Sequence, residues 1–185
     1  MNAEQKNFIE VVGAIASTDM KNSGVAASLT IAQAIIESAW GKSELTKTGN
    51  ALFGIKATSN WKGKTLKRKT TEYEDGKKVQ VEAEFRAYAT WEESVKDHSA
   101  FLKKYKRYAK VIGETDYKEA CKAVAAAEYA TDPEYEKKLI ELIETYELYN
   151  YDTKNTETDN LEAEEKKYYR VQAGAFRKKE GAELT

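Results

Sequence analysis

One carboxylate, Glu37, follows a run of residues, Ser28 to Ile36, that is apolar on almost every side. A helix that is hydrophobic all round is normally buried, so the pattern predicts an acid at the end of a core helix, before the stop signal at Gly41. Burial and the negative end of the helix dipole both disfavour the anion, and we expect a raised pKa for Glu37. A carboxylic acid that keeps its proton near neutral pH can protonate the leaving oxygen of a glycosidic bond. The same pattern also fits a Glu37 that points outward or caps a neighbouring loop.

Glu72 is a second candidate carboxylate, which a β-hairpin would position. Asp75-Gly76 is a strong signal for a two-residue turn, and apolar side chains alternate over residues 79–85 after it. In that register Glu72 faces Val79 and lies on the inward side of the hairpin, where a carboxylate calls for a reason. Two alternatives stay open. A longer turn would reverse the parity, and a hairpin end that projects into solvent would let Glu72 pair with a lysine.

Cysteine and histidine usage removes several classes of enzyme. The chain of 185 residues has one Cys and one His, so an intrachain disulfide and the ligand set of a typical zinc hydrolase are both missing. Cys121 lies on an apolar stripe and is predicted to be a core thiol. His98 shares a helical face with Val95 and Leu102 and is predicted to be structural. We therefore expect chemistry based on carboxylates, hydroxyls and aromatic rings, without a metal or cofactor.

Charge and hydropathy bound the partners of the chain. Lys and Arg number 30 against 31 Asp and Glu, so we expect no strong field for nucleic acid or an anionic membrane. No apolar run approaches the length of a transmembrane helix, and the first six residues lack the basic-then-apolar layout of a signal peptide. The twelve Tyr and three Trp fit the remaining chemistry, because aromatic faces stack on sugar rings.

The candidate residues need a framework, and helical spacing with capping signals predicts one. We expect a mainly helical α+β body with five or so helices, one hairpin and an ordered loop over residues 42–63. The expected helices lie around residues 3–16, from 25 or 28 to 40, from the capping box at Thr90, from the box at Asp116 to about 128, and from Asp132-Pro133 onward.

The composition changes after Asp152, because residues 153–167 are almost wholly polar or charged. This stretch is typical of a linker or a frayed helix. We divide the chain into a body of residues 1–151, a polar linker of 152–167 and a C-terminal segment of 168–185. The last segment, roughly eighteen residues, is too short to bury a core alone.

Several blocks of residues occur together in an order that one known family shares. The blocks are Ala32–Ser43 (AQAIIESAWGKS), Asn50–Lys56 (NALFGIK), Thr70–Tyr73, Phe85–Tyr88, Ser94 with Asp97-His98 and Phe101-Leu102, and Tyr129–Tyr135 (YATDPEY). They resemble the signature of glycoside hydrolase family 73, the endo-β-N-acetylglucosaminidases of bacterial autolysins, flagellar wall hydrolases and phage endolysins. The resemblance covers about residues 3 to 150, and the joint occurrence of the blocks is highly specific.

The resemblance implies a lysozyme-like fold, in which a mostly helical domain and a small β-hairpin lobe enclose a sugar-binding groove. By position, Glu37 would be the general acid, and Glu72 would act as base or stabilise the oxocarbenium-like transition state. Asp97 and Tyr129 occupy further family positions associated with the groove. Three weaker positions, for which packing is the alternative role, are Trp40, Tyr73 and Tyr88.

The activity that the resemblance implies is hydrolysis of the β-1,4 bond after N-acetylglucosamine in peptidoglycan. We expect a monomer that acts on the glycan strands of the bacterial cell wall, with no nucleic acid and no membrane insertion. A phage-type release after cytoplasmic synthesis and a host autolysin fit the chain alike. The alternatives are a muramidase or lytic transglycosylase on the same fold, and a non-catalytic peptidoglycan-binding module. An amidase or endopeptidase is disfavoured, because the metal and thiol constellations are missing.

The C-terminal run Tyr169–Phe176 (YRVQAGAF), with Lys179 and Ala182 after it, resembles the start of a sporulation-related (SPOR) repeat. Modules of that family bind the glycan strands of peptidoglycan. Only the first strand and the opening of its helix are present here. We therefore expect no binding from this incomplete SPOR-like segment.

Overall fold

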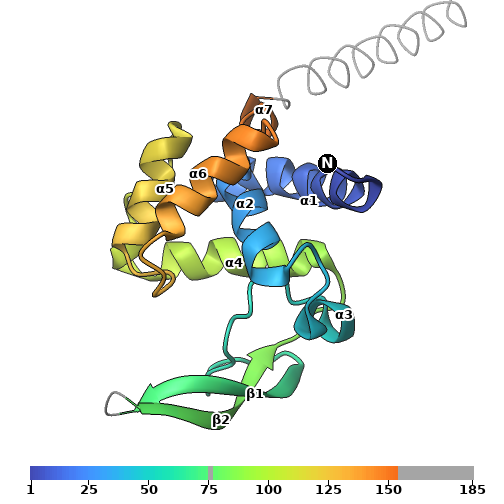
Figure 1. Ribbon diagram of the computed structural model, residues 1–185, viewed down its shortest axis with the longest axis vertical. Helices are drawn as coiled ribbons and strands as arrows, with labels where there is room; N and C mark the ends of the chain where they lie inside the picture. The colour runs from blue at the N-terminus through green and yellow to red at the C-terminus, as the bar shows by residue number, and fades with distance from the viewer. Residues whose placement is uncertain (75–76, 154–185) are drawn as a thin grey trace, which may run out of the picture. The chain divides into compact units, whose positions relative to one another are not determined.

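The computed structural model describes residues 1–74 and 77–153, and it describes the side chains of this range except those of residues 71–78. A helical body and a two-stranded antiparallel hairpin lobe make up this part of the chain (Figure 1), which confirms the mainly helical α+β fold. The elements are, in chain order, α1 (Ala3–Ser23), α2 (Ala27–Ser38), α3 (Glu44–Gly49), β1 (Thr65–Glu74), β2 (Lys77–Arg86), α4 (Trp91–Lys104), the 3-10 helix η1 (Lys106–Tyr108), α5 (Tyr117–Ala126), α6 (Tyr135–Thr145) and α7 (Asn150–Thr153).

The centre of the body is α2, whose residues 27–35 are all buried. Helices α1, α5 and α6 pack against it, and α4 packs against α1. The all-round apolar pattern therefore has its expected cause, because no face of α2 meets solvent until its last turn. The start of α2 lacks a side-chain cap of its own. Instead Asp152 of α7 accepts a hydrogen bond from the Ser28 N–H (2.8 Å), which satisfies one of the free donors of the helix N-terminus.

The end of α2 differs from the sequence prediction, which extended the helix to Trp40. The helix stops at Ser38, because Ala39 (φ 49°), Trp40 (φ 62°) and Gly41 (φ 77°) are all in the left-handed region. The Ser38 hydroxyl accepts a hydrogen bond from the Gly41 N–H (2.7 Å) and closes this turn. Glu37 is therefore in the last helical turn, next to the point at which the chain changes direction.

Other boundaries follow local hydrogen bonds. Helix α1 runs past the predicted end at residue 16 to Ser23, where Gly24 (φ 74°) terminates it. Helix α6 begins at Tyr135 and not at Pro133, because the Asp132 side chain accepts a hydrogen bond from the Glu134 N–H (2.9 Å) and forms a turn instead. The predicted loop over residues 42–63 contains the short helix α3.

The hairpin has the predicted register. Glu72 pairs with Val79 and Glu74 with Lys77, so the strands are joined by a two-residue turn. The base of the hairpin is tied to the segment after α3 by backbone hydrogen bonds, from the Arg86 N–H to the Ile55 carbonyl (2.9 Å) and from the Ala57 N–H to the Glu84 carbonyl (2.8 Å). These bonds hold the lobe at its base, on the side of the body where α2 ends (Figure 1).

Two further sequence predictions concern the ends of the fold. The first two residues of the predicted linker of 152–167 lie in α7, and the rest of it and the SPOR-like segment of 168–185 lie outside the described residues, so these divisions stay predictions. Within the part of the chain that is described, no helix combines the length and the apolar character needed to cross a membrane.

Cys121 is buried, as predicted for a core thiol, and burial raises its pKa to about 12.

Candidate active site

Glu37 is held at the end of α2 by a hydrogen-bonded chain of three side chains. The Tyr135 hydroxyl, at the start of α6, donates to Glu37 Oε1 (3.0 Å). The same hydroxyl accepts a hydrogen bond from Gln33 Nε2 (3.2 Å), one turn earlier on α2. Because Gln33 and Tyr135 are both buried, this chain fixes the direction of the Glu37 carboxyl. Glu37 therefore neither points freely into solvent nor caps a loop, the two alternatives that its sequence pattern left open.

The protonation of Glu37 is set by two opposing effects. Burial, the larger effect, raises its pKa above the ordinary value, because a carboxylate is poorly solvated there. The hydrogen bond from Tyr135 lowers the pKa and offsets part of this rise, since it stabilises the charged form. The net direction is upward, as the sequence predicted. The environment thus favours the protonated form of Glu37 more than water does.

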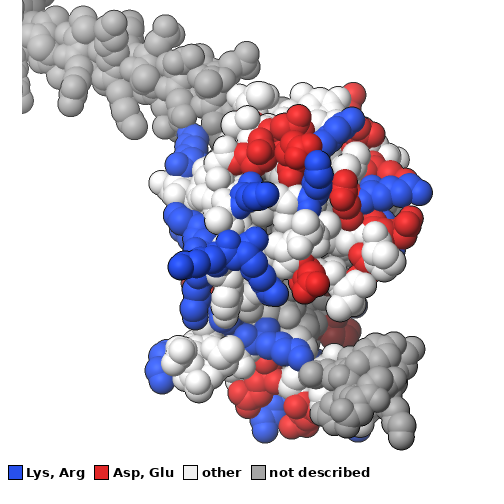
Figure 2. All heavy atoms as spheres, turned by 90° about the vertical axis from the view of Figure 1, so that its left-hand side faces the viewer, with Lys and Arg blue, Asp and Glu red and all other residues white. Residues whose placement is uncertain are grey.

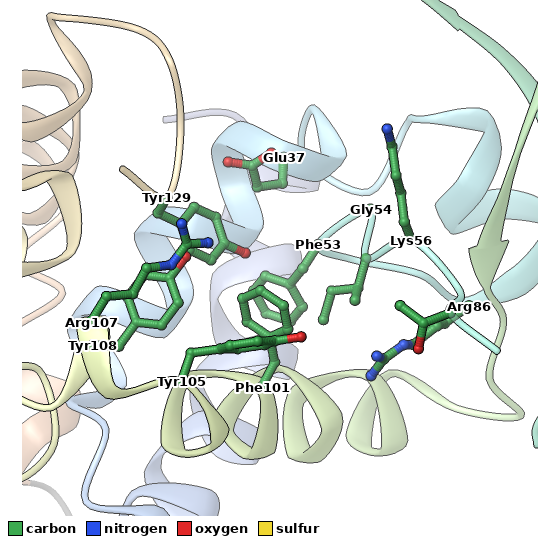
Figure 3. Close-up of a pocket in the computed structure, with 12 residues that line it drawn as sticks. Glu37, Phe53, Gly54, Lys56, Arg86, Phe101, Tyr105, Arg107, Tyr108 and Tyr129 are labelled. Atoms are coloured by element: carbon green, nitrogen blue, oxygen red, sulfur yellow. The ribbon is translucent and has the colours of Figure 1, made fainter. Parts of the chain in front are cut away.

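Glu37 opens into a cavity of about 340 Å³ between the helical body and the base of the hairpin lobe (Figure 3). Figure 3 shows the Glu37 carboxyl on one side of this cavity, with Phe101 of α4 and Tyr105, the residue after α4, on the opposite side. Among the described residues that line it, Glu37 is the one carboxylate. The lining consists of Glu37, Phe53, Gly54, Ile55, Lys56, Thr58, Arg86, Phe101, Tyr105, Arg107, Tyr108 and Tyr129. Aromatic faces and cations thus surround a single acid.

Tyr129 forms the aromatic wall next to the acid. Its ring stacks on that of Tyr135, with ring centroids 6.0 Å apart and an interplanar angle of 13°. It also meets Tyr108 and Phe101 edge-on. Burial raises the pKa of Tyr129 well above its ordinary value, so the phenol keeps its proton. The family position assigned to Tyr129 from the sequence therefore lies beside Glu37 in the pocket.

His98 lies under the pocket and takes no part in its lining. Its ring stacks on Phe53, with centroids 3.9 Å apart, and is met edge-on by Tyr129. It is fully buried, and neither ring nitrogen has a hydrogen-bond partner among the described residues. Burial lowers its pKa to about 3, so the ring is neutral and acts as a flat support for Phe53. The structural role predicted for His98 is confirmed.

Asp97 and Tyr88 do not line the pocket, although the family resemblance associates both positions with the groove. Both oxygens of Asp97 accept hydrogen bonds from Arg86 Nη1 (3.0 and 2.9 Å), and the Tyr88 hydroxyl donates to Asp97 Oδ2 (2.7 Å). Burial, and then the Asp97 carboxylate, raise the pKa of Tyr88. Arg86 itself lines the pocket and lies 4.8 Å from the ring centre of Trp61. Asp97 therefore contacts Arg86, a residue that lines the pocket, and Tyr88 contacts Asp97.

Of the other three candidate residues, Trp40 alone has a described side chain, and it does not line the pocket. Trp40 turns to the opposite side of α2, where it packs edge-on against Phe8 and Tyr146 and lines a separate hollow between α2 and α6. The backbone of Glu72 and Tyr73 lies on β1, with Glu72 opposite Val79. Their side chains fall outside the description, so their contribution to the site stays a prediction.

Sequence reasoning missed the residues that hold or surround the acid. Gln33 precedes Glu37 by four residues and therefore shares its helical face, which was an available signal. Tyr135 and Arg86 belong to blocks of the family resemblance, but nothing in their spacing indicates what they contact. Tyr105 follows α4, and Arg107 is in η1. A run of basic and aromatic residues there was the sequence signal that could have indicated them.

Within residues 1–74 and 77–153, no group of three His, Cys, Asp or Glu side chains is arranged to hold a metal ion. The described site thus offers one carboxyl with a raised pKa, a hydrogen-bond donor behind it, stacked aromatic rings and cations. Such a set can bind a sugar ring against an aromatic face and donate a proton to its leaving oxygen.

Comparisons with known proteins agree with this geometry. The glucosaminidase family model, described as mannosyl-glycoprotein endo-β-N-acetylglucosaminidase, matches residues 13–148. The chain is 40% identical over 157 residues to the exo-glucosaminidase LytG of Bacillus subtilis, covering 82% of this chain and 55% of that protein. It is 33% identical over 166 residues to the peptidoglycan hydrolase FlgJ of Salmonella typhimurium, covering 88% and 52%. The chain thus spans about half the length of these curated relatives.

A solved structure gives the same result for the fold. The crystal structure of the catalytic domain of the autolysin Auto from Listeria monocytogenes matches with a TM-score of 0.75 and 34% identity, covering 82% of this chain and 89% of that one. This match confirms the lysozyme-like glycoside hydrolase fold that the sequence blocks implied.

Proposed function

The chain belongs to the glucosaminidase family, glycoside hydrolase family 73, and from this premise we propose that it hydrolyses the β-1,4 bond after N-acetylglucosamine in peptidoglycan. The observation that carries the proposal is the position of Glu37. It is the one carboxyl among the described lining residues of an aromatic pocket, and burial raises its pKa. A glycosidase needs an acid of this kind to protonate its leaving group.

The mechanism starts with Glu37 in its protonated form. Tyr135 holds the carboxyl toward the pocket, and Glu37 donates its proton to the oxygen of the scissile bond as the bond to the sugar breaks. The charge that develops on the sugar then needs a stabilising group on the other face. We assign that task to Glu72 on the hairpin lobe, as a base for water or as a charge stabiliser. The acetamido group of the substrate is the alternative nucleophile.

The described walls of the pocket support substrate binding. Tyr129 offers its ring and its phenol next to the acid. Arg86, held by Asp97 and Tyr88, contributes a cation at the hairpin side. We propose that Tyr129 contacts the sugar, whereas Asp97 and Tyr88 act through Arg86. Tyr73 stays a candidate contact on the lobe, and Trp40 is assigned to packing on the far side of α2.

The partner implied by the family is peptidoglycan, and the proposed place of action is the bacterial cell wall. The printed names of the relatives include both an exo-glucosaminidase and peptidoglycan hydrolases. We propose internal cleavage of the strand by a monomer. Release as a phage-type endolysin and action as a host autolysin are both compatible with this chemistry.

Mass spectrometry of the new reducing ends tests the proposal. Purified peptidoglycan is digested with the wild-type chain and, as a control, with Glu37→Gln, and the products are reduced before analysis. We expect new N-acetylglucosamine reducing ends from the wild type and none above background from the variant. New N-acetylmuramic acid reducing ends would show a muramidase, and anhydro ends a lytic transglycosylase. Pelleting with the wall and no new ends of any kind would show a non-catalytic binding module.

A further inference from the structure

A group of exposed cations adjoins the Glu37 pocket, and its lysines have no role in the chemistry described so far. The basic cluster consists of Lys104 at the end of α4, Lys106 and Arg107 in η1, and Lys110 in the turn that follows. Four positive charges within seven residues repel one another, which costs stability unless a partner neutralises them. The arrangement therefore calls for a reason.

The surroundings of the basic cluster do not supply that partner. In the part of the chain that the structure describes, none of its four members forms an ion pair. Two carboxylates, Glu114 and Glu119, border the hollow beside Arg107 and Lys110. Both are already engaged, since Glu114 accepts hydrogen bonds from the N–H groups of Thr115 and Asp116, and Glu119 pairs with Lys122.

Many lysines elsewhere on the described surface have a carboxylate beside them. Each of a large set has a carboxylate partner: Lys6, Lys42, Lys47, Lys67, Lys96, Lys118, Lys122, Lys137 and Lys138. Figure 2, which faces the side of the molecule where α4 ends, shows Lys and Arg gathered in one area, whereas acidic and basic side chains alternate over the rest of the upper body. The basic cluster thus differs from this large set in having four cations within seven residues and no ion-pair partner among the described residues.

That place adjoins the active site. Arg107 and Tyr105 line the same cavity as Glu37, and Figure 3 shows Arg107 and Tyr108 on the side of the cavity where Tyr129 lies. The Arg107 guanidinium lies 4.8 Å from the centre of the buried Tyr108 ring, so its position is restrained by a cation–π contact. Tyr105 is 37% exposed and has the Lys104 ammonium 5.6 Å from its ring centre. The basic cluster is therefore continuous with the pocket rim.

Resting on the proposed function, we propose that the basic cluster binds the carboxylates of the peptide stems of peptidoglycan. These stems are carried by alternate sugars, so an anion attached to the strand itself comes within reach of the rim when a neighbouring sugar occupies the pocket. A guanidinium on the rim can bind a carboxylate through two parallel hydrogen bonds, and the lysines add point charges around it. The substrate class is then a peptide-bearing glycan strand, and a bare strand of neutral sugars is a poorer substrate.

Peptide carboxylates are preferred to other anions because the basic cluster is continuous with the rim of the pocket. A separate wall polymer with phosphate groups would need a basic surface, but nothing would require that surface to begin at the catalytic pocket. An anion on the cleaved strand must lie beside the pocket. The position of Arg107, which contributes to both the cavity and the basic cluster, favours the second case.

The test compares two triple variants with the same loss of charge. One is Lys104→Gln/Lys106→Gln/Lys110→Gln, which removes the lysines of the basic cluster and leaves the pocket lining intact. The matched control is Lys6→Gln/Lys96→Gln/Lys137→Gln, at exposed lysines on α1, α4 and α6 that have carboxylate partners. Thermal unfolding confirms that both variants fold. Their substrates are cell walls stripped of phosphate polymers, before and after amidation of the peptide carboxylates with a neutral amine.

We expect the cluster variant to cleave unmodified stripped walls roughly tenfold more slowly at low wall concentration, as three weak ion pairs would predict, and to bind them less in a pelleting assay. Amidation of the walls should slow the wild type and the control variant by a similar factor and slow the cluster variant less, because only Arg107 of the basic cluster remains in it. The proposal is overturned if the two variants behave alike on unmodified walls. It is equally overturned if wild-type binding falls when the phosphate polymers are stripped, because phosphate would then be the ligand.

This experiment separates the inference from the function on which it rests. If the wild type releases no reducing ends from any wall, the proposed glycosidase activity fails. The pelleting assay still reports on the basic cluster in that case, because it measures binding to unmodified and amidated walls without turnover. A Glu37→Gln background provides the same measurement when cleavage would dissolve the pellet.

Discussion

The two sides of the pocket are built in different ways. On the side of the helical body, Glu37 projects from a helix whose residues 27–35 are all buried, and two buried side chains determine its orientation. On the side of the lobe, Glu72, the proposed second carboxylate, belongs to a strand of a sheet of only two strands. An isolated two-stranded hairpin is marginally stable at best in water. The properties of the acid thus depend on the whole core, whereas the position of its partner depends on a few contacts at the base of the hairpin lobe.

Those contacts can be identified. Backbone hydrogen bonds join Ile55 to Arg86 and Ala57 to Glu84, and Phe85, between Glu84 and Arg86 in the sequence, is buried. The ion pair of Arg86 with Asp97 adds a side-chain link from the lobe to α4. Rigid-body motion of the lobe about this base would change the distance between the two carboxyls, on which inversion or retention depends. Because Glu37 and the proposed second carboxylate, Glu72, are positioned by different contacts, each can be tested by its own substitution.

The largest expected loss of activity comes from a substitution on the side of the helical body, at Glu37. Glu37→Gln should remain folded, since Gln can still accept the Tyr135 hydrogen bond, but should lose about 10³-fold in kcat as the proton donor is removed. Glu72→Gln should lose less, about tenfold, if the hairpin carboxylate assists the step. Rates of reducing-end release from purified walls measure both.

The control for this pair is Glu82→Gln, an exposed carboxylate on the same hairpin that pairs with Lys67. It should keep the wild-type rate. Near-normal lysis by Glu37→Gln would refute the assignment of the acid. A Glu72→Gln rate equal to that of Glu82→Gln would move the second carboxylate elsewhere, with Glu74 and Asp97 as the next candidates.

A smaller effect is expected from the link between body and lobe. Asp97→Asn removes the charge that holds Arg86, and Arg86 is then half-buried without a counter-ion. We expect a loss of about 2 kcal/mol in the free energy of unfolding, because breaking one partner of a sheltered pair leaves the other charge uncompensated. Activity should fall roughly tenfold through the displaced Arg86. Chemical denaturation and wall hydrolysis measure the two effects.

Glu92→Gln is the matched control, because Glu92 lies on the same helix and pairs with Lys96 at the surface. It should change neither stability nor rate measurably. If Asp97→Asn behaves like this control, Arg86 is positioned by other contacts and the link between body and lobe does not matter.

The sequence predicted those features that depend on local pattern. The all-round apolar run gave the burial of α2, and Asp75-Gly76 gave the two-residue turn and its register. Capping signals placed the start of α4 and α5, where Thr90 and Asp116 accept hydrogen bonds from the helix N–H groups. Each of these signals depends on a few neighbouring residues, so it can be interpreted without knowledge of the tertiary fold.

The features that escaped prediction depend on contacts across the chain. Tyr135 and Glu37 are 98 residues apart, and only the packing of α6 against α2 brings them together. The early end of α2 at Ser38 depends on three successive left-handed residues, of which Gly41 alone is a glycine. The ion pair that diverts Asp97 from the pocket joins α4 to the end of β2. Local spacing contains no information about such pairings.

The smallest expected effect concerns the hydrogen bond between Tyr135 and Glu37 in the helical body. Tyr135→Phe removes the hydrogen bond that favours the charged form of Glu37 and leaves its burial in place. The pKa of Glu37 should therefore rise further, and the alkaline limb of kcat/KM, where the acid loses its proton, should move to higher pH. The cost in stability should be about 1 kcal/mol, because the buried Gln33 amide also loses its acceptor.

The same shift should appear in folding. Because the folded-state pKa of Glu37 lies above its ordinary value of 4.5, the folded chain binds this proton more tightly than the unfolded chain does. The stabilisation is present in full below the unfolded value and is lost as pH rises through the folded one. In Tyr135→Phe this loss should extend to higher pH. Tyr117→Phe, which removes a surface hydrogen bond to Glu144, is the control and should move neither profile. An alkaline limb that stays in place or moves to lower pH would mean that Tyr135 does not act on the proton of Glu37.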